Sequence, residues 1–208
     1  MNRVRTGVLI SGRGSNMSAL IEAARDRAFP AEIAVVLSDK PGAAGLAAAR
    51  EAGVAARAVD ARAFAGKAAF EAAVTDALAE AEVELVCLAG FMRILSPAFV
   101  ERWRGRILNI HPSLLPDLRG LDTHERALAE GRSEHGCTVH FVTAALDAGP
   151  IVAQARVPVL AGDDAARLAA RVLAEEHRIY PQALASVARA LRQATAAQGR
   201  AIAPLASR

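Results

Sequence analysis

Short apolar runs that alternate with segments of helical spacing are the feature that most constrains the fold of this chain. Runs typical of buried strands lie at residues 4–11, 32–38, 54–59, 84–89 and 107–111. Between them, apolar residues recur every three or four positions, at residues 16–28, 43–51, 64–81 and 97–103. Strands and helices in strict alternation form βαβ units, whose strands are parallel. This half of the chain therefore predicts a parallel sheet with helices on its faces.

The second half of the chain changes pattern. A helix is expected at residues 123–130, and two strand-like segments at 137–142 and 151–157 then lie close together across a turn. Strands joined by so short a connection are antiparallel. They predict an addition that makes the sheet mixed.

A long helix, capped by Asp163 or Asp164, is expected to run from there to about Gln193. No Gly/Ser-rich linker, repeat or block of like charge divides the chain. We therefore expect an α/β protein with a single Rossmann-like domain over residues 1–193, in which helices flank a mainly parallel, mixed central sheet. The weak pattern of residues 194–208 predicts a mobile C-terminal tail.

Composition excludes several classes of protein. The chain has 208 residues, of which 53% are hydrophobic and only two are cysteines, so it can bury a core without disulfides. No apolar run approaches the roughly 18 residues of a membrane helix and no secretory leader is recognisable, which predicts a cytoplasmic protein without a membrane partner. A net charge of +3 with 4% aromatic residues argues against a nucleic-acid partner. No histidine pair has the spacing of metal ligands, so no metal is expected.

A glycine-rich turn, Gly12-Arg13-Gly14-Ser15-Asn16, follows the first predicted strand and opens the first helix. Backbone N–H groups at such a turn bind anions, helped by the helix dipole. Asp39, after the second strand, resembles the ribose-binding acid of dinucleotide folds. Met17, however, stands where that fingerprint needs its third glycine, so a mononucleotide phosphate is favoured over NAD. A purely structural tight turn is the remaining alternative.

Two further motifs carry potential chemistry. Asn109 and His111 are two apart at the end of the fifth predicted strand, so both side chains point to one face. An amide and an imidazole there would suit a tetrahedral oxyanion, and a hydrogen-bonded strand end is the structural alternative. Asp147, before Gly149-Pro150, is either a turn residue or the carboxylate that orients His111. His140 could face core or site, and His135 is expected in a loop.

Together these segments resemble the phosphoribosylglycinamide formyltransferase family of folate-dependent enzymes. The resemblance covers about residues 2–190. It is carried by SGRGSN, LAGFMRILS, LNIHPSLLP, GCTVHFV, LDAGPI and EEHRIYP, which begin at residues 11, 88, 108, 136, 146 and 175. It implies that residues 1–193 are the formyltransferase domain. It also implies transfer of the formyl group of 10-formyltetrahydrofolate to the amine of glycinamide ribonucleotide, in purine biosynthesis.

The resemblance also implies roles for individual residues. Asn109 would donate to the oxyanion, His111 would be the general acid, and Asp147 would orient His111. The substrate-binding positions would be Gly14, Ser15, Asn16 and Glu176. The positions matching the binding segments for the folate co-substrate are Lys67, Met92, Arg93, Ile94, Leu95, Thr143, Ala144, Ala145, Leu146 and Asp147. The two small molecules are the expected partners, and the chain is expected to be a monomer or a homodimer.

The chain departs from the family's common pattern at four positions. Lys67 stands where arginine is frequent. Lysine keeps the positive charge but cannot make the two parallel hydrogen bonds that an arginine makes to a carboxylate. Asp117 and Asp122 replace a frequent lysine and histidine in the 117–124 loop. Ala148 replaces a common glycine, which is a minor change if its φ is negative.

Other functions remain open from the sequence. A methionyl-tRNA formyltransferase would need an additional C-terminal domain, for which too few residues follow position 190. A formyltetrahydrofolate hydrolase would need an N-terminal regulatory domain, whereas the first predicted strand starts near residue 4. An NAD-dependent oxidoreductase or a non-catalytic nucleotide-binding module are the alternatives from other classes.

Overall fold

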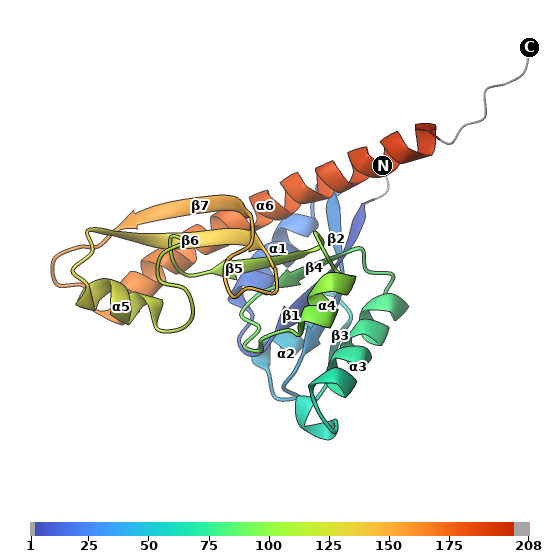
Figure 1. Cartoon of the computed structure of the whole chain (residues 1–208), viewed down its shortest axis with the longest axis horizontal. Helices are drawn as coiled ribbons and strands as arrows, with labels where there is room; N and C mark the ends of the chain where they lie inside the picture. Colours follow the sequence, from blue (N-terminus) through green and yellow to red (C-terminus); the bar gives the residue numbers. More distant parts are fainter. Residues whose placement is uncertain (1–2, 202–208) are drawn as a thin grey trace, which may run out of the picture.

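Seven strands form one sheet in the order β3-β2-β1-β4-β5-β6-β7 (Figure 1). The computed structural model describes residues 3–201. The strands are β1 (Val4–Ile10), β2 (Ala31–Ser38), β3 (Ala56–Ala58), β4 (Leu85–Leu88), β5 (Ile107–His111), β6 (Glu134–Phe141) and β7 (Ile151–Pro158). The α-helices are α1 (Ser15–Ala24), α2 (Ala44–Glu51), α3 (Lys67–Glu80), α4 (Pro97–Arg102), α5 (Thr123–Ala129) and α6 (Ala165–Ala201).

The sheet is mixed, as the sequence predicts. Strands β1 to β5 pair in parallel, whereas β6 pairs antiparallel with β5, and β7 antiparallel with β6. In the β5–β6 ladder Asn109 lies opposite His140 and His111 lies opposite Thr138. Because β1 has β2 on one side and β4 on the other, the sheet has its topological switch point at the carboxyl end of β1. Ligands of open α/β sheets bind at such crevices.

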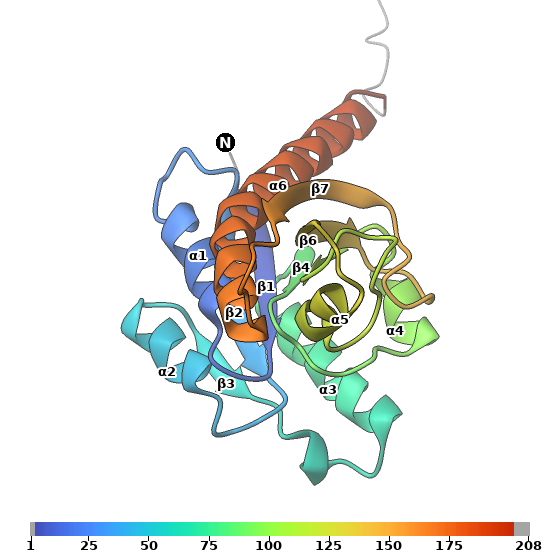
Figure 2. The same cartoon turned by 90° about the vertical axis from the view of Figure 1, so that its left-hand side faces the viewer.

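The two faces of the sheet bury separate apolar cores. Helices α1, α2 and α6 cover one face (Figure 2), where Met17, Leu46 and Leu184 pack against strand residues such as Val8. Helices α3 and α4 cover the other face, where Phe70 and Trp103 are among the buried residues. Successive side chains of a strand point to opposite faces, which explains why the buried strands read as continuous apolar runs.

The element boundaries differ from the sequence prediction at several places. The first helix ends at Ala24 rather than at residue 28, and α3 begins at Lys67, after a separate 3₁₀ turn at Ala61–Ala63. Helix α6 continues to Ala201, eight positions beyond the predicted end, so the expected tail is helical up to there and its last residues lie outside the described part. His135 lies in strand β6, not in a loop.

Two helices begin with side-chain caps, and the one at Asp164 is a cap that the sequence predicts. The Asp164 carboxylate accepts a hydrogen bond from Arg167 N at 2.8 Å, and the Ser96 hydroxyl accepts one from Phe99 N at 3.2 Å before Pro97. Both satisfy amides that have no acceptor within the first turn of a helix. Within residues 3–201, none of the helices combines the length and the apolar character needed to cross a bilayer.

Candidate active site

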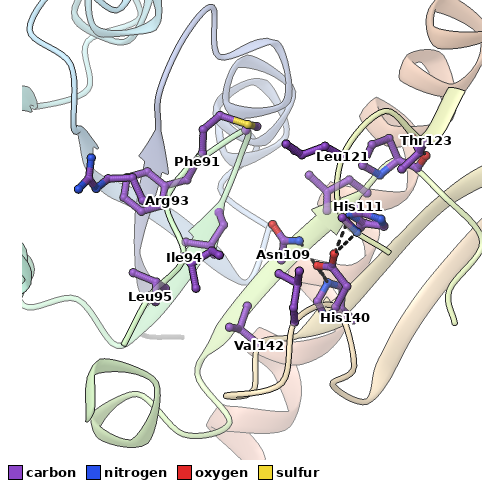
Figure 3. A pocket seen from close by; sticks show the side chains of 18 of the residues that line it. Phe91, Arg93, Ile94, Leu95, Asn109, His111, Leu121, Thr123, His140 and Val142 are labelled. Carbon is purple, nitrogen blue, oxygen red and sulfur yellow. Dashed lines mark hydrogen bonds and ion pairs between the residues drawn. The ribbon is translucent and has the colours of Figure 1, made fainter. Parts of the chain in front are cut away.

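The end of β5 opens into a cavity of about 530 Å³ (Figure 3). Asn109 and His111 both line it, as the alternation of the strand predicts. His111 is 6% exposed although it is ionisable. Two histidine-bearing strands and the 143–147 loop thus place an amide, an imidazole and a carboxylate around one end of the cavity.

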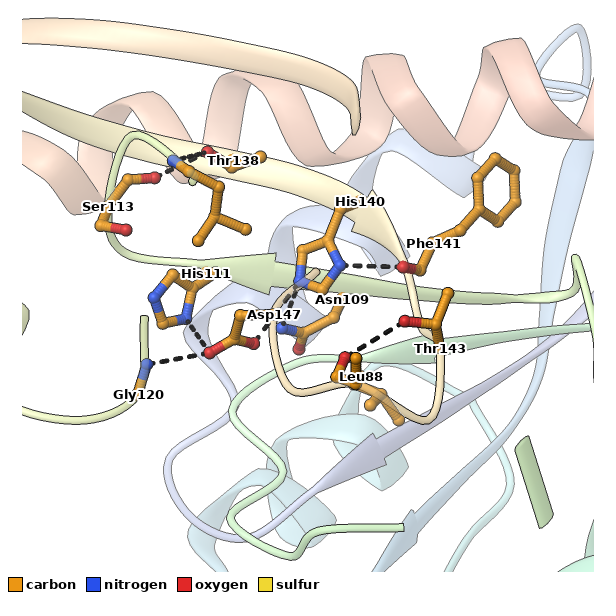
Figure 4. Close-up of polar contacts among 12 residues, drawn as sticks. Leu88, Asn109, His111, Ser113, Gly120, Thr138, His140, Phe141, Thr143 and Asp147 are labelled. Atoms are coloured by element: carbon orange, nitrogen blue, oxygen red, sulfur yellow. Dashed lines mark hydrogen bonds and ion pairs between the residues drawn. The ribbon is translucent and has the colours of Figure 1, made fainter. Parts of the chain in front are cut away.

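Asp147 faces His111, so the structure brings together the three residues proposed as catalytic. Its Oδ2 lies 3.5 Å from His111 Nδ1 and accepts a hydrogen bond from Gly120 N at 3.0 Å (Figure 4). Asp147 has a φ of 47°, a left-handed conformation that aspartate tolerates better than most residues. On its other side, His111 Nε2 lies 3.0 Å from the carbonyl oxygen of Leu118. Both ring nitrogens of His111 therefore face oxygen atoms that can accept a hydrogen bond.

His140 completes the group, and sequence reasoning left its direction open. Asn109 Nδ2 lies 3.1 Å from His140 Nε2, and His140 Nδ1 lies 2.9 Å from the Phe141 carbonyl oxygen. Burial lowers the pKa of His140, so the ring is neutral and donates from Nδ1 to that carbonyl. Its Nε2 is then an acceptor, which holds one N–H of Asn109 and leaves the other N–H for a ligand.

All of the predicted donor-binding residues except Lys67 line the cavity. It is lined by all of residues 92–95 and 143–147 that the family resemblance singles out, together with Phe91, Leu121 and Val142. Several large apolar side chains at its mouth are exposed, among them Met92 (66%), Ile94 (72%) and Leu121 (74%). Exposed apolar groups gathered around a concave site are typical of ligand-binding surfaces.

The glycine turn lies beside this cavity, at the end of β1. Gly14 has a φ of 74°, and a Cβ atom there would lie 3.3 Å from Gly45 Cα, so both the turn and the close approach require glycine. The first backbone hydrogen bond of α1 runs from Ser18 N to Gly14 O at 2.9 Å. The amides of the preceding residues therefore point out of the helix end, as an anion site needs.

Asn16 and Glu176 meet although 160 positions separate them. Asn16 Nδ2 donates to Glu176 Oε2 at 2.6 Å, and Asn16 Oδ1 is buried without a hydrogen-bond partner. Burial raises the pKa of Glu176, and the bond from Asn16 partly offsets that shift. Two of the predicted substrate-binding residues thus form one polar group between α1 and α6.

The positions that depart from the family pattern have different surroundings. Lys67 is exposed at the start of α3 and is not part of the cavity lining, so its role stays a prediction. Asp117 pairs with Arg132 at 2.7 Å and is not part of the cavity lining. Asp122 lines the cavity and precedes α5 with a φ of 56°. Ala148 does not have a positive φ, so alanine is unstrained there.

Two more histidines lie close together near the site, and one of them, His124, lines the cavity. His124 Nδ1 is 3.1 Å from His135 Nε2, and their rings meet edge to face. Burial, and to a lesser extent the neighbouring His124, lower the pKa of His135 to about 4. Among residues 3–201, no group of three or more histidine, cysteine or carboxylate side chains is arranged to hold a metal ion.

We predict that His135 makes the fold acid-sensitive. Its pKa is about 4 in the folded chain and about 6.5 when exposed, so the unfolded chain binds more protons between these values. The free energy of unfolding should therefore be fully maintained above pH 6.5 and fall as the pH drops towards 4. Urea unfolding at several pH values would show a steeper decline for the wild type than for His135→Gln. Equal slopes would contradict the prediction.

Comparison with known proteins bears on this geometry. The model of the family described as formyl transferase matches residues 4–184. The chain belongs to the formyl transferase family. Membership disfavours the oxidoreductase alternative, and Asp39, which suggested a dinucleotide, instead lies 3.8 Å from Arg93.

Several members of the formyl transferase family with similar sequences carry the name of a single activity. Phosphoribosylglycinamide formyltransferase of Escherichia coli is 49% identical over 84% of this chain and 82% of its own length. A crystal structure of the Brucella melitensis protein of that name is 55% identical, with a TM-score of 0.87, and the match covers 90% of this chain and 96% of that one.

Longer relatives share only one part with this chain. The human trifunctional purine biosynthetic protein adenosine-3 is 47% identical over 89% of this chain, and the match covers 18% of that protein. This formyl transferase chain therefore spans less than a fifth of the trifunctional relatives that it matches.

Proposed function

We propose that this chain transfers the formyl group of 10-formyltetrahydrofolate to the amine of glycinamide ribonucleotide, giving formylglycinamide ribonucleotide and tetrahydrofolate. The observation that carries the proposal is the position of Asn109, His111 and Asp147 at one end of an apolar cavity, beside a glycine turn suited to a phosphate. The names of the close relatives support the same reaction. A cytoplasmic location is part of this proposal.

The cavity fits a folate donor. Its volume of about 530 Å³ falls in the range of sites for drug-sized ligands, and its lining is largely apolar. The backbone of residues 92–95 and 143–147 would offer donors and acceptors to the polar edge of a flat heterocycle, and Met92, Ile94 and Leu146 would supply apolar surface for its faces. When bound, this co-substrate supplies the formyl group and accepts a proton at the nitrogen that it leaves with.

Asn109, His111 and Asp147, the proposed catalytic trio, would then stabilise the charge that develops in the reaction and transfer protons. Attack by a primary amine on a formyl carbon creates a tetrahedral oxyanion, which needs donors already in place. The N–H of Asn109 that His140 does not hold is one donor, and the His111 imidazolium is the other. The amine loses one proton and the leaving nitrogen gains one, so the site needs a group that exchanges protons, a role suited to His111.

One contact has to change for this chemistry. His111 Nε2 is occupied by the Leu118 carbonyl at 3.0 Å, whereas Nδ1 faces the carboxylate that balances the ring's charge. The proposed reaction therefore requires the Leu118 carbonyl to give up Nε2 to the substrate while Asp147 stays at Nδ1. Leu118 has a φ of 52°, an unfavourable conformation for a leucine, which makes such a rearrangement less costly.

The acceptor substrate would lie between the glycine turn and the trio. Amides at the start of α1 would bind its phosphate, and the Asn16–Glu176 pair would bind hydroxyl or amide groups. The unpartnered Asn16 Oδ1 is available to a hydrogen-bond donor. These contacts leave the amine to reach the cavity end where Asn109 and His111 lie.

A direct assay tests the proposal. Purified chain is mixed with glycinamide ribonucleotide and 10-formyltetrahydrofolate, and the absorbance of the released folate is followed. We expect release that depends on both substrates. Release without the ribonucleotide would instead indicate a hydrolase, and absence of release with both substrates would contradict the proposal.

Gly14 provides a test of the acceptor site. Gly14→Val should weaken binding of glycinamide ribonucleotide far more than binding of tetrahydrofolate, because a side chain there blocks the phosphate and is strained at a φ of 74°. Calorimetry with each ligand separately measures both effects. Equal losses for the two ligands would mean that the turn has only a structural role.

A further inference from the structure

The segment of residues 90–96, here called the donor wall, forms one side of the cavity and is anchored at its start by β1. Ser11 N donates to Gly90 O at 3.1 Å, and Met92 N donates to Ser11 Oγ at 2.9 Å. The wall carries no regular secondary structure, so its shape depends on such side-chain and backbone anchors. The exposed Met92 and Ile94 are the groups that this shape presents to a ligand.

The far end of the donor wall is held by a buried carboxylate on α3. Glu71 Oε1 accepts a hydrogen bond from Ser96 N at 2.7 Å, and Glu71 Oε2 accepts one from the Ser96 hydroxyl. The same hydroxyl accepts from Phe99 N and so starts α4. One side chain thereby fixes both the end of the wall and the beginning of the next helix.

Burying the Glu71 carboxylate is energetically unfavourable if its only role is to hold the chain in place. Glu71 is 6% exposed, and both of its carboxylate oxygens accept hydrogen bonds from Ser96 rather than from a cationic side chain. A buried carboxylate without a cation is destabilising unless its hydrogen bonds are strong. Bonds from donors to a charged acceptor are shorter and stiffer than neutral ones, which favours a precise position for Ser96.

The middle of the donor wall has a separate anchor. Arg93 Nη1 lies 3.8 Å from Asp39 Oδ2, and its guanidinium lies 5.0 Å from the centre of the Phe70 ring. Asp39 is buried, and its Oδ1 has no hydrogen-bond partner. Phe70 and Glu71 are neighbours on α3, so this helix supports the wall at two points.

We propose that Glu71 is a positioning residue for the formyl donor: through Ser96 it fixes the donor wall, although it does not line the cavity itself. The proposal rests on the proposed function, because it takes the ligand of this cavity to be a folate. It predicts that loss of the carboxylate weakens the folate site selectively. The phosphate turn, on β1 and α1, should be unaffected.

Glu71→Gln tests the proposal with little change in volume. The glutamine can accept from Ser96 N, but its amide presents a donor to the Ser96 hydroxyl. We expect the Kd for tetrahydrofolate and the KM for the formyl donor to rise about tenfold, the effect of one charge-assisted hydrogen bond, with a smaller change in kcat. The Kd for glycinamide ribonucleotide should stay within about twofold of wild type.

Asp163→Asn is the matched control. Asp163 also accepts from a backbone amide, that of Leu160 at 2.8 Å, and pairs with Arg171, but it lies outside the cavity lining. The Asp163→Asn variant should be less stable than wild type, and its Kd for each of the two ligands should be unchanged. A similar loss of tetrahydrofolate binding in Asp163→Asn would show that the effect of Glu71 is general destabilisation.

Ser96→Ala provides an independent test of the proposal if the Glu71→Gln variant does not fold. It keeps the bond from Ser96 N and removes only the hydroxyl, and it should also raise the Kd for tetrahydrofolate selectively. In the double variant the two effects should not add, because they break the same contact. A folded Glu71→Gln or Ser96→Ala that binds tetrahydrofolate as wild type does, or that weakens both ligands alike, overturns the proposal. Wild-type chain that binds no folate would instead refute the proposed function and this inference with it.

Discussion

Replacing His111 with alanine should lower kcat by roughly 10²–10⁴ while the chain still folds. The ring lies at a strand end between Asp147 and the Leu118 carbonyl, so its loss removes the proton-exchanging group rather than a large part of the core. Initial rates at saturating concentrations of both substrates measure the effect, and circular dichroism establishes that the variant is folded.

His177→Ala is a suitable control for this variant. His177 lies on α6, outside the cavity lining, and burial lowers its pKa as expected of a neutral structural histidine. Its removal should leave kcat within about twofold of wild type. A His111→Ala variant that retains more than about a tenth of wild-type turnover would refute the catalytic role of His111.

Asp147→Asn should lower kcat by about 10²–10³ through electrostatics rather than shape. The asparagine oxygen can still accept the hydrogen bond from Gly120 N, and asparagine tolerates the φ of 47°. The variant removes the one negative charge that the structure places between the rings of His111 and His140. Its amide would also present a donor towards His111 Nδ1, where the carboxylate accepted one.

Comparing activity with stability separates this role from that of a turn residue. Loss of the charge beside His111 should lower kcat while the thermal unfolding temperature stays close to that of wild type. A merely structural Asp147 would lower that temperature and leave the kcat of the folded protein unchanged. Initial rates for both proteins, with thermal unfolding in parallel, distinguish the two outcomes.

Strand and helix alternation in the sequence was enough to predict the parallel half of the sheet, because buried parallel strands are recognisable apolar runs. The prediction was less accurate where tertiary contacts decide. Residues 25–28 continue the helical spacing of α1, yet the helix ends at Ala24. His135 follows polar residues and resembles a loop position, but pairing of β6 with β7 draws it into a strand.

Part of the candidate site was equally visible in the sequence. The two-residue spacing of Asn109 and His111 predicts a shared face, and both line the cavity. The role of His140 was not predictable, because it depends on the antiparallel register with β5 and on the irregularity between Val139 and His140 opposite β7. The role of Glu71 is not predictable from the sequence, because its partner Ser96 lies 25 positions away. The motif around Ser96 does not indicate that its hydroxyl and amide bond to a carboxylate on another helix.

The antiparallel ladder between β5 and β6 also determines where insertions and deletions are compatible with the geometry of the site. Asn109 and His140 are register partners, and the long connection between their strands leaves the described ladder at His111 and returns at Thr138. Insertions in that connection alter the cavity rim but keep the two side chains opposite each other. A single residue inserted into β6 between Thr138 and His140 would turn the imidazole to the other face of the sheet. Natural variants of this chain should therefore vary in length before β6 and keep the spacing within it.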